Sequence, residues 1–399
     1  ARRSVVVFLR VSALLVAINA SLFFLLYPRR GISTNSIPEG CICIYDGLEY
    51  DFCYRLRENT SIQGRRMSCT SAAILHKLGL IGGNKNYVDL RNEEMPSPVM
   101  VTAFSQDHWD EARRLISTIR RFWPEQLIIA YDLGVDEATA RIVREQSNIQ
   151  YREFKFHDYP SYMQRLLDFR WKPIVIAETL NEFGAIWYMD SSIVMRKGDL
   201  QHVYDLLRCK RSRNRTINQL LASTALRDKR EAITANESDW DQMQWLENIR
   251  ECRKSTYLLH GYTGHGIFAV THSNTYIYIP TNFNEIKKPK AKMYEAGIAF
   301  AVRTAETMEN IVKWYVLCAL EEGCMGGNYS HSCHFSESGD RFGKYADCHR
   351  FDQSVVNLLL ANTYYYDPHY YVSEIVDFFQ VVRGVSMIEE ALNLTRGQT

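Results

Sequence analysis

The chain has 399 residues, 46% of them hydrophobic, with 47 lysines and arginines against 46 aspartates and glutamates. Its aliphatic and aromatic content excludes collagen-like, low-complexity and wholly disordered chains. A formal net charge of +1 provides no basic field for nucleic acid, although a nucleotide needs only a local site. The length fits one large domain or two modest ones.

An almost wholly apolar stretch runs from Val5 to Tyr27. As a helix it would span about 34 Å, which is enough to cross a bilayer. Arginines lie on both sides of it, so charge favours a cytoplasmic N-terminus only slightly. A cleaved signal peptide is the alternative, but the segment Phe23 to Pro28 lacks the small residues that a signal peptidase needs. We expect residues 1–28 to form a cytoplasmic stub and a retained transmembrane anchor.

Cysteines and glycosylation sequons predict that the rest of the chain lies in an oxidising compartment. There are ten cysteines, four of them within residues 41–69, and no pair has the spacing of a zinc site. Sequons begin at Asn59, Asn214, Asn236, Asn328 and Asn393. A cytosolic protein with buried reduced thiols is the alternative. Together with the anchor, these features predict a single-pass type II membrane protein whose main domain lies in the lumen of the Golgi or endoplasmic reticulum.

The sequence pattern changes at Pro96 to Pro98. Residues 29–95 show few sustained apolar periods and predict a cysteine-bearing stem. Beyond them, apolar runs at 99–104, 127–131 and 149–154 indicate strands, and helices are expected at 109–123 and 135–147. This alternation predicts an α/β domain over residues 96–399, with right-handed crossovers and a parallel sheet. Ligands of such sheets usually lie at the carboxyl ends of the strands.

Further elements are expected along the rest of the domain. A helix begins near Pro173 and ends at Gly184, leading directly into an apolar strand at 185–189. Residues 200–253 are biased toward helix. We expect a strand at 267–270, core-facing helices over 293–321 and a further helix at 351–360.

The strongest site signal is Asp190, which ends the apolar strand at 185–189. A carboxylate there can hold a divalent cation against a diphosphate, and a turn-capping role is the alternative. Thr102 and Ala103 end the first expected strand and Asp132 ends the second, so parallel strands would bring them to the same crevice. Lys172 adjoins the N-terminus of the Pro173 helix, where an anion could bind, although a surface lysine is the simpler reading.

Three segments together resemble the nucleotide-diphospho-sugar transferases of the GT-A fold: Pro98–Asp132, Trp171-Lys172-Pro173 and Trp187–Ser192. The resemblance is to an expanded, uncharacterised invertebrate family that is itself similar to family-eight glycosyltransferases. It covers about residues 96–395. It implies a Rossmann-like GT-A fold with a mixed, mainly parallel sheet flanked by helices. It also implies a sugar nucleotide, often a UDP-sugar, bound over the strand ends.

The resemblance further implies an Asp-x-Asp motif that binds Mn²⁺ or Mg²⁺ and the diphosphate. Asp190 takes the first place of that motif and Ser192 takes the third. Because a hydroxyl is a much weaker ligand than a carboxylate, the site would be low-affinity, metal-independent or inactive. Many relatives supply a metal-binding histidine near the C-terminus, and His369 lies in that region without the usual glycines and lysine around it.

The resemblance places Asp352 and Gln353 at the start of a helix that faces the acceptor and the donor sugar. Asp352 could orient a sugar hydroxyl, act as a base, or only complement the helix dipole. His265 and Gly266 resemble part of a glycine-containing strand beside the sugar pocket, although a core or loop position for His265 is the alternative.

The expected function is that of a hexosyl- or pentosyltransferase, which moves a sugar from a nucleotide sugar to a glycan, protein or lipid acceptor. A catalytically degenerate GT-A protein that binds glycans or serves as a membrane scaffold is the alternative, and Ser192 favours it. A disulfide-rich ectodomain with a signalling role is a third reading, against which the buried apolar strands argue.

Overall fold

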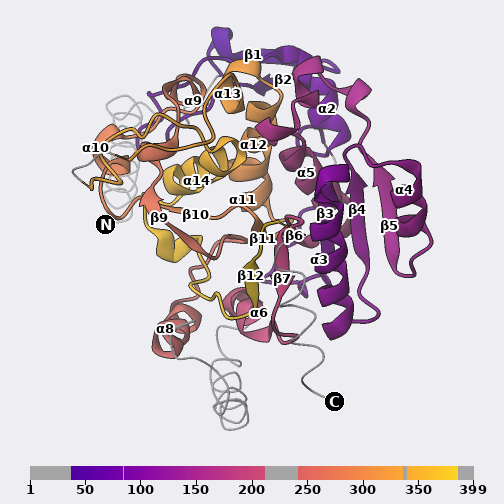
Figure 1. The fold of residues 1–399 in the computed structure, drawn as a ribbon. Coiled ribbons are helices and arrows are strands. Elements are labelled where there is room, and N and C mark those ends of the chain that lie inside the picture. Colours follow the sequence, from indigo (N-terminus) through magenta and orange to yellow (C-terminus); the bar gives the residue numbers. More distant parts are fainter. Residues whose placement is uncertain (1–36, 84, 212–240, 336–338, 385–399) are drawn as a thin grey trace, which may run out of the picture.

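The computed structural model describes residues 37–83, 85–211, 241–335 and 339–384 (Figure 1). The expected anchor at residues 5–27 lies outside these ranges, as do the sequons at Asn214, Asn236 and Asn393. Within the described ranges, no helix is both long and apolar enough to span a bilayer.

A six-stranded sheet lies at the centre of the fold, in the order β5-β4-β3-β6-β11-β8 (Figure 1). Four strands are parallel, and β11 runs antiparallel to both β6 and β8. The expected α/β fold with a mixed, mainly parallel sheet is therefore confirmed. The strands are β3 (Val99–Phe104), β4 (Ile128–Asp132), β5 (Ile149–Glu153), β6 (Ala185–Met189), β8 (Tyr257–Leu258) and β11 (Ile298–Val302).

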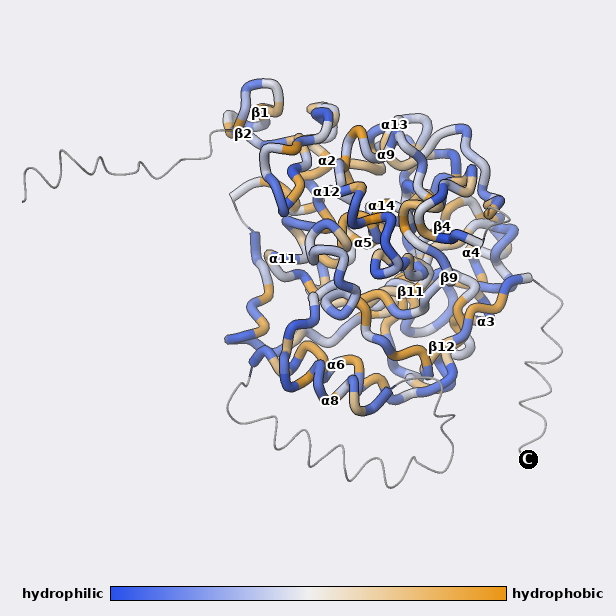
Figure 2. Tube along the Cα trace, turned by 90° about the vertical axis from the view of Figure 1, so that its left-hand side faces the viewer, coloured by the Kyte–Doolittle hydropathy of each residue, from blue (hydrophilic) through white to orange (hydrophobic). Residues whose placement is uncertain are grey.

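Side chains alternate between the two faces of the sheet and so separate two hydrophobic cores. Val101 and Tyr188 pack on the face covered by α5, α12 and α14. Met100 and Trp187 pack on the opposite face, against α3, α6 and α8. The tube along α6 alternates between hydrophobic and hydrophilic colours in Figure 2, as expected for a helix with one buried face. These helices are α3 (Trp109–Phe122), α5 (Trp171–Phe183), α6 (Gln201–Arg208), α8 (Gln242–Glu251), α12 (Lys313–Ala319) and α14 (Phe351–Thr363).

Shorter elements surround the central sheet. Three two-stranded ribbons in the described ranges pair β1 (Ile42–Tyr45) with β2 (Leu48–Asp51), β7 (Ile193–Met195) with β12 (Phe379–Val381), and β9 (Tyr262–Gly266) with β10 (Lys292–Tyr294). The remaining helices are α2 (Ala72–Lys77), α4 (Glu137–Arg144), α9 (Ser273–Tyr278), α10 (Phe283–Ile286), α11 (Ala305–Thr307) and α13 (Glu322–Met325). A π-helical stretch, Met308–Val312, joins α11 to α12.

The structure corrects two sequence predictions. The helices expected over 293–321 begin only at Ala305, because residues 292–302 contain β10 and β11. Strand β11 is buried along its whole length, and a short apolar run does not distinguish a buried strand from a buried helix. The strand expected at 267–270 is mostly a 3-10 turn at Phe268–Val270, and the strand itself lies earlier, over the glycine-containing β9.

The described part of the expected stem packs on the same core as the sheet. Phe52 and Leu75 are fully buried in one cluster with residues of α5 and α12. All ten cysteines are paired, in agreement with the oxidising compartment expected from the sequence. The bridges are Cys41–Cys53, Cys43–Cys69, Cys209–Cys252, Cys318–Cys324 and Cys333–Cys348.

Candidate functional site

A pocket of about 350 Å³ lies at the carboxyl end of β6. Its walls come from the start of α5, the segment after β6, the β9–β10 ribbon and the start of α14. The pocket is completed by His331, Phe335, Arg341, Val381 and Arg383. Ligands of open α/β sheets bind in this position, so the pocket is the candidate functional site.

Lys172 is the central charge of the pocket. Its Nζ lies 2.9 Å from Oδ1 of Asp190 and 2.6 Å from Oδ2 of Asp352, and its side chain is only 3% exposed. Burial favours the neutral amine, but the two carboxylates outweigh it and raise the pKa of Lys172. A cation in the first turn of α5 is opposed by the helix dipole, so the two carboxylates stabilise the ammonium in this place.

The two carboxylates differ in their environment. Asp190 has 30% of its side chain exposed, and its Oδ1 accepts a hydrogen bond of 2.9 Å from the hydroxyl of Tyr188. Asp352 lies in the first turn of α14 and is 7% exposed. Its Oδ2 forms an ion pair with Lys172, but the geometry of this contact is not that of a hydrogen bond. Burial raises the pKa of Asp352; Lys172 opposes this effect and the charge of Asp190 adds to it. Asp190 is therefore the more exposed of these two carboxylates, both of which line the pocket.

Two bulky residues beside this ion cluster have left-handed backbone conformations. Phe169, with φ of 52°, precedes α5, and Phe351, with φ of 39°, begins α14. Such conformations cost on the order of 1–3 kcal/mol each and persist where packing fixes them, often at functional sites. Both residues line the pocket, and the ring of Phe169 lies 5.3 Å from Nζ of Lys172.

Three arginines supply further positive charge to the pocket: Arg341, Arg350 and Arg383. In the part of the chain that the structure describes, none of them forms an ion pair with a carboxylate. Burial and the neighbouring charge of Arg383 lower the pKa of Arg350, and Asp352 opposes this effect. Guanidinium groups without a carboxylate partner are suited to bind an anion, because they can donate two parallel hydrogen bonds to phosphate oxygens.

The charged side chains of the pocket lining have a small positive excess, which favours an anionic ligand. Glu295 is the only other acidic residue of the lining besides Asp190 and Asp352 among the described residues. Burial raises its pKa, although Arg383 opposes that shift. Lys172 and the three arginines carry four positive charges against the three carboxylates of the lining, which leaves an excess of one positive charge.

Six residues predicted from the sequence line this one pocket, although they come from four separate stretches of chain: Lys172, Asp190, Ser192, His265, Asp352 and Gln353. His265 is buried, which lowers its pKa to about 4, so it is neutral at pH 7. Its ring lies 5.5 Å from that of Phe335.

Five other predicted residues do not line the pocket. Thr102 and Ala103 are buried within the sheet. The carboxylate of Asp132 accepts the backbone N–H groups of the turn after β4 and the hydroxyl of Tyr151. Asp132 therefore caps the turn that follows β4.

Gly266 and His369 complete this group. A Cβ atom at Gly266 would lie 2.6 Å from the ring of Phe342, and its N–H donates to the carbonyl of Arg341. Gly266 thus lets the segment that carries Arg341 approach the ribbon, without contacting the pocket itself. His369 is exposed, and its Nδ1 lies 2.7 Å from Oε1 of Glu374.

Of the predicted metal ligands, Asp190 and Ser192 line the pocket, whereas His369 does not. Across the described ranges, the one group of three acidic, histidine or cysteine side chains within mutual reach is Cys41, Asp51 and Cys53. Its cysteines form a disulfide, which leaves no thiolate to bind a metal. The residues at the pocket do not fit a divalent cation.

The pocket residues that sequence reasoning missed include Glu295, His331, Phe335, Arg341, Arg350 and Arg383. Arg350 was the one with a usable signal, since it stands two residues before Asp352. The others lie in polar segments whose composition does not distinguish a ligand-binding side chain from a solvated one.

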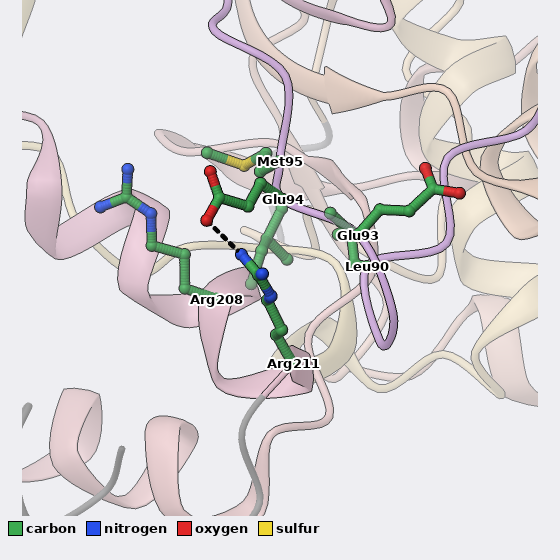
Figure 3. A pocket seen from close by; sticks show the side chains of 7 residues that line it. Leu90, Glu93, Glu94, Met95, Arg208 and Arg211 are labelled. Atoms are coloured by element: carbon green, nitrogen blue, oxygen red, sulfur yellow. Dashed lines mark ion pairs between the residues drawn. The ribbon is translucent and has the colours of Figure 1, made fainter. Parts of the chain in front are cut away.

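A second pocket of about 370 Å³ lies between residues 90–95 and the end of α6 (Figure 3). Glu94 and Arg211 point toward one another there, at 2.6 Å. Hydrogen bonding and charge attraction from Arg211 lower the pKa of Glu94. Both arginines of this pocket have carboxylate partners, Arg211 with Glu94 and Arg208 with Asp205, so this pocket does not share the unpaired arginines of the first.

The Cys333–Cys348 bridge should contribute to ligand affinity, because it constrains the segment that carries Phe335 and Arg341. Replacing both cysteines with serine should weaken the binding of an anionic probe, inorganic pyrophosphate, about tenfold, since binding must then order the segment. Calorimetry on the full-length protein measures this change. The same replacement at Cys41 and Cys53, which do not line the pocket, is the control, and an equal loss there would contradict the prediction.

Comparisons with known proteins concern part of the sequence and the general fold. A family model described as a protein of unknown function (DUF1647) matches residues 41–177. No curated protein matches the sequence. Solved structures with similar folds include WbbM, described as a bifunctional glycosyltransferase, at 11% identity and a TM-score of 0.34. That match covers 69% of this chain and 39% of WbbM, so this chain spans less than half of its length.

The galactosyltransferase LgtC, solved with donor and acceptor sugar analogues, is also similar, at 10% identity and a TM-score of 0.31. The match covers 68% of this chain and 72% of LgtC. An active-site mutant of LgtC matches at 11% identity and a TM-score of 0.28, over 61% of this chain and 83% of the other.

Proposed function

We propose that this protein is a glycosyltransferase that moves a sugar from a nucleotide-diphosphate donor, most simply a UDP-sugar, to a glycan, protein or lipid acceptor. The observation that carries the proposal is the pocket at the carboxyl end of β6. There, three arginines without carboxylate partners among the described residues face the Lys172–Asp190–Asp352 cluster. The resemblance of the Trp187–Ser192 segment to nucleotide-diphospho-sugar transferases agrees with it.

The chemistry follows from these groups. Transfer breaks the bond between the anomeric carbon and a phosphate oxygen and forms a bond to the oxygen of an acceptor hydroxyl. The proton of that hydroxyl would pass to the departing diphosphate or to the carboxylate of Asp190. The arginines and Lys172 would stabilise the charge that develops on the departing diphosphate. Asp190 and Asp352 would accept hydrogen bonds from sugar hydroxyls and so orient the reacting centre.

We further propose that the protein acts in the secretory pathway, held in the membrane by residues 5–27. The five disulfides fit such a compartment. Membrane extraction and protease protection of the full-length protein in microsomes would test this topology.

The donor site is tested by Arg350→Gln and Arg383→Gln. Each change removes a guanidinium from the pocket and should raise the Kd for UDP about tenfold, the usual cost of losing a hydrogen bond to a charged group. Calorimetry and a screen of nucleotide sugars for hydrolysis provide the measurements. Arg113→Gln changes an arginine that is 61% exposed on α3 and should leave UDP binding as it is. Unchanged UDP affinity in both pocket variants would refute the assignment.

A degenerate protein that binds nucleotide or glycan without turnover is the second candidate. Ser192, in the place of a second carboxylate, favours it. UDP binding together with no hydrolysis or transfer of any nucleotide sugar would support this candidate over the first.

A further inference from the structure

The position between Asp190 and Asp352 is taken by a side chain of this protein. Nζ of Lys172 contacts both carboxylates, at 2.9 Å and 2.6 Å, and solvent reaches only 3% of the lysine side chain. A divalent ion held at the end of β6 would need oxygen ligands from these same groups. The ammonium therefore competes directly with any metal for them.

The remaining oxygen atoms do not offer an alternative metal site. Oδ1 of Asp190 is shared between Lys172 and the hydroxyl of Tyr188. Oδ2 of Asp190 lies 3.3 Å from the same ammonium. Ser192 offers a hydroxyl only, so a second positive ion would lie beside a buried ammonium with few anionic ligands, where repulsion is poorly screened.

The surroundings of Lys172 stabilise a cation in this position. Its Nζ lies 5.3 Å from the ring centre of Phe169 and 5.2 Å from that of Tyr188. Aromatic faces attract cations at such distances. The lysine is thus fixed by two carboxylates and two rings, as a bound ion would be.

We propose that Lys172 is the resident cation of the pocket, replacing a divalent metal, so that a nucleoside diphosphate binds through Lys172 and the three arginines without Mn²⁺. The choice of ligand rests on the proposed function, whereas the exclusion of the metal rests on the geometry of Lys172, Asp190 and Asp352.

Calorimetry on the full-length wild-type protein tests the proposal with two probes, MnCl₂ alone and UDP. Mn²⁺ alone should give no binding heat. The Kd for UDP measured in EDTA should agree within about twofold with the Kd measured in Mn²⁺, because UDP binding and Mn²⁺ binding are not coupled. A tightening of UDP binding by about tenfold or more with Mn²⁺ would overturn the proposal. So would binding of Mn²⁺ alone at the pocket.

Lys172→Ala is the informative variant, because it leaves two carboxylates without their cation. It should gain Mn²⁺ binding and a UDP affinity that rises about tenfold with Mn²⁺. Lys77→Ala, which changes a lysine that is 70% exposed, is the control and should resemble the wild type in both measurements. A folded Lys172→Ala protein that does not bind Mn²⁺, and whose affinity for UDP does not change with Mn²⁺, would contradict the proposed role of Lys172.

The wild-type measurements decide the question even if circular dichroism shows that Lys172→Ala does not fold. Absence of UDP binding in both EDTA and Mn²⁺ would contradict the proposed function. Binding of MnCl₂ alone would still test the role of Lys172 in that case, so the two failures are distinguishable.

Discussion

Replacing Asp190 with asparagine should lower the rate of sugar transfer by at least about 100-fold, the usual cost of removing one preorganised electrostatic group. Asp190 is the more exposed of the two carboxylates that contact Lys172 in the pocket, and it also fixes Nζ of Lys172 at 2.9 Å. Asparagine keeps the shape but removes the charge, so both the contact with the sugar and the position of the ammonium are affected.

The rate is measured with the full-length protein and the nucleotide sugar that it hydrolyses fastest. Asp110→Asn is the matched control, because Asp110 is 46% exposed on α3 and pairs only with Arg113 in the described structure. Its rate should stay near that of the wild type. An Asp190→Asn protein with a wild-type rate would exclude Asp190 from the reaction.

Replacing Arg170 with methionine should lower the free energy of unfolding by about 3–5 kcal/mol, as expected when one partner of a buried ion pair is removed. Arg170 is fully buried, and its Nε lies 3.1 Å from Oδ2 of Asp168. Its guanidinium also donates to three backbone carbonyls, those of Ala319, Glu321 and Glu322. The variant leaves these carbonyls without their donor and leaves Asp168 with Arg165, at 3.2 Å, as its ion-pair partner.

Urea unfolding monitored by circular dichroism measures this loss. Arg113→Met, on the exposed side of α3, should change the free energy of unfolding by less than about 0.5 kcal/mol. A loss below about 1 kcal/mol for Arg170→Met would show that the carbonyls and Asp168 find other partners. Since Arg170 adjoins Lys172, the same contacts also fix the start of α5 at the pocket.

Local signals were sufficient to predict much of the fold. The apolar runs of β3 and β6 and the glycine that ends α5 are properties of a few consecutive residues, and each element formed where the sequence indicated it. Strand β11 escaped prediction, because its antiparallel place between β6 and β8 depends on residues more than 40 positions away. Elements that depend on contacts between residues far apart in the sequence are therefore the ones that local patterns do not predict.

The candidate site shows the same limit. Asp190 and Asp352 had signals of their own, a strand end and a helix start, and Lys172 adjoined a proline at a helix start. The sequence could not predict that both carboxylates contact the ammonium of Lys172, because this contact requires α14 to begin beside α5. Arg383 had no local signal at all, because it lies outside any helix or strand and is exposed.

The Cys209–Cys252 bridge ties the end of α6 to the end of α8 across 43 positions of sequence. A single cut of the backbone between these cysteines would therefore give two polypeptides that remain one molecule until they are reduced. Lys172 and Asp190 would belong to the first polypeptide and Asp352 to the second. A proteolytically matured, two-chain form of this protein would keep its ion cluster complete.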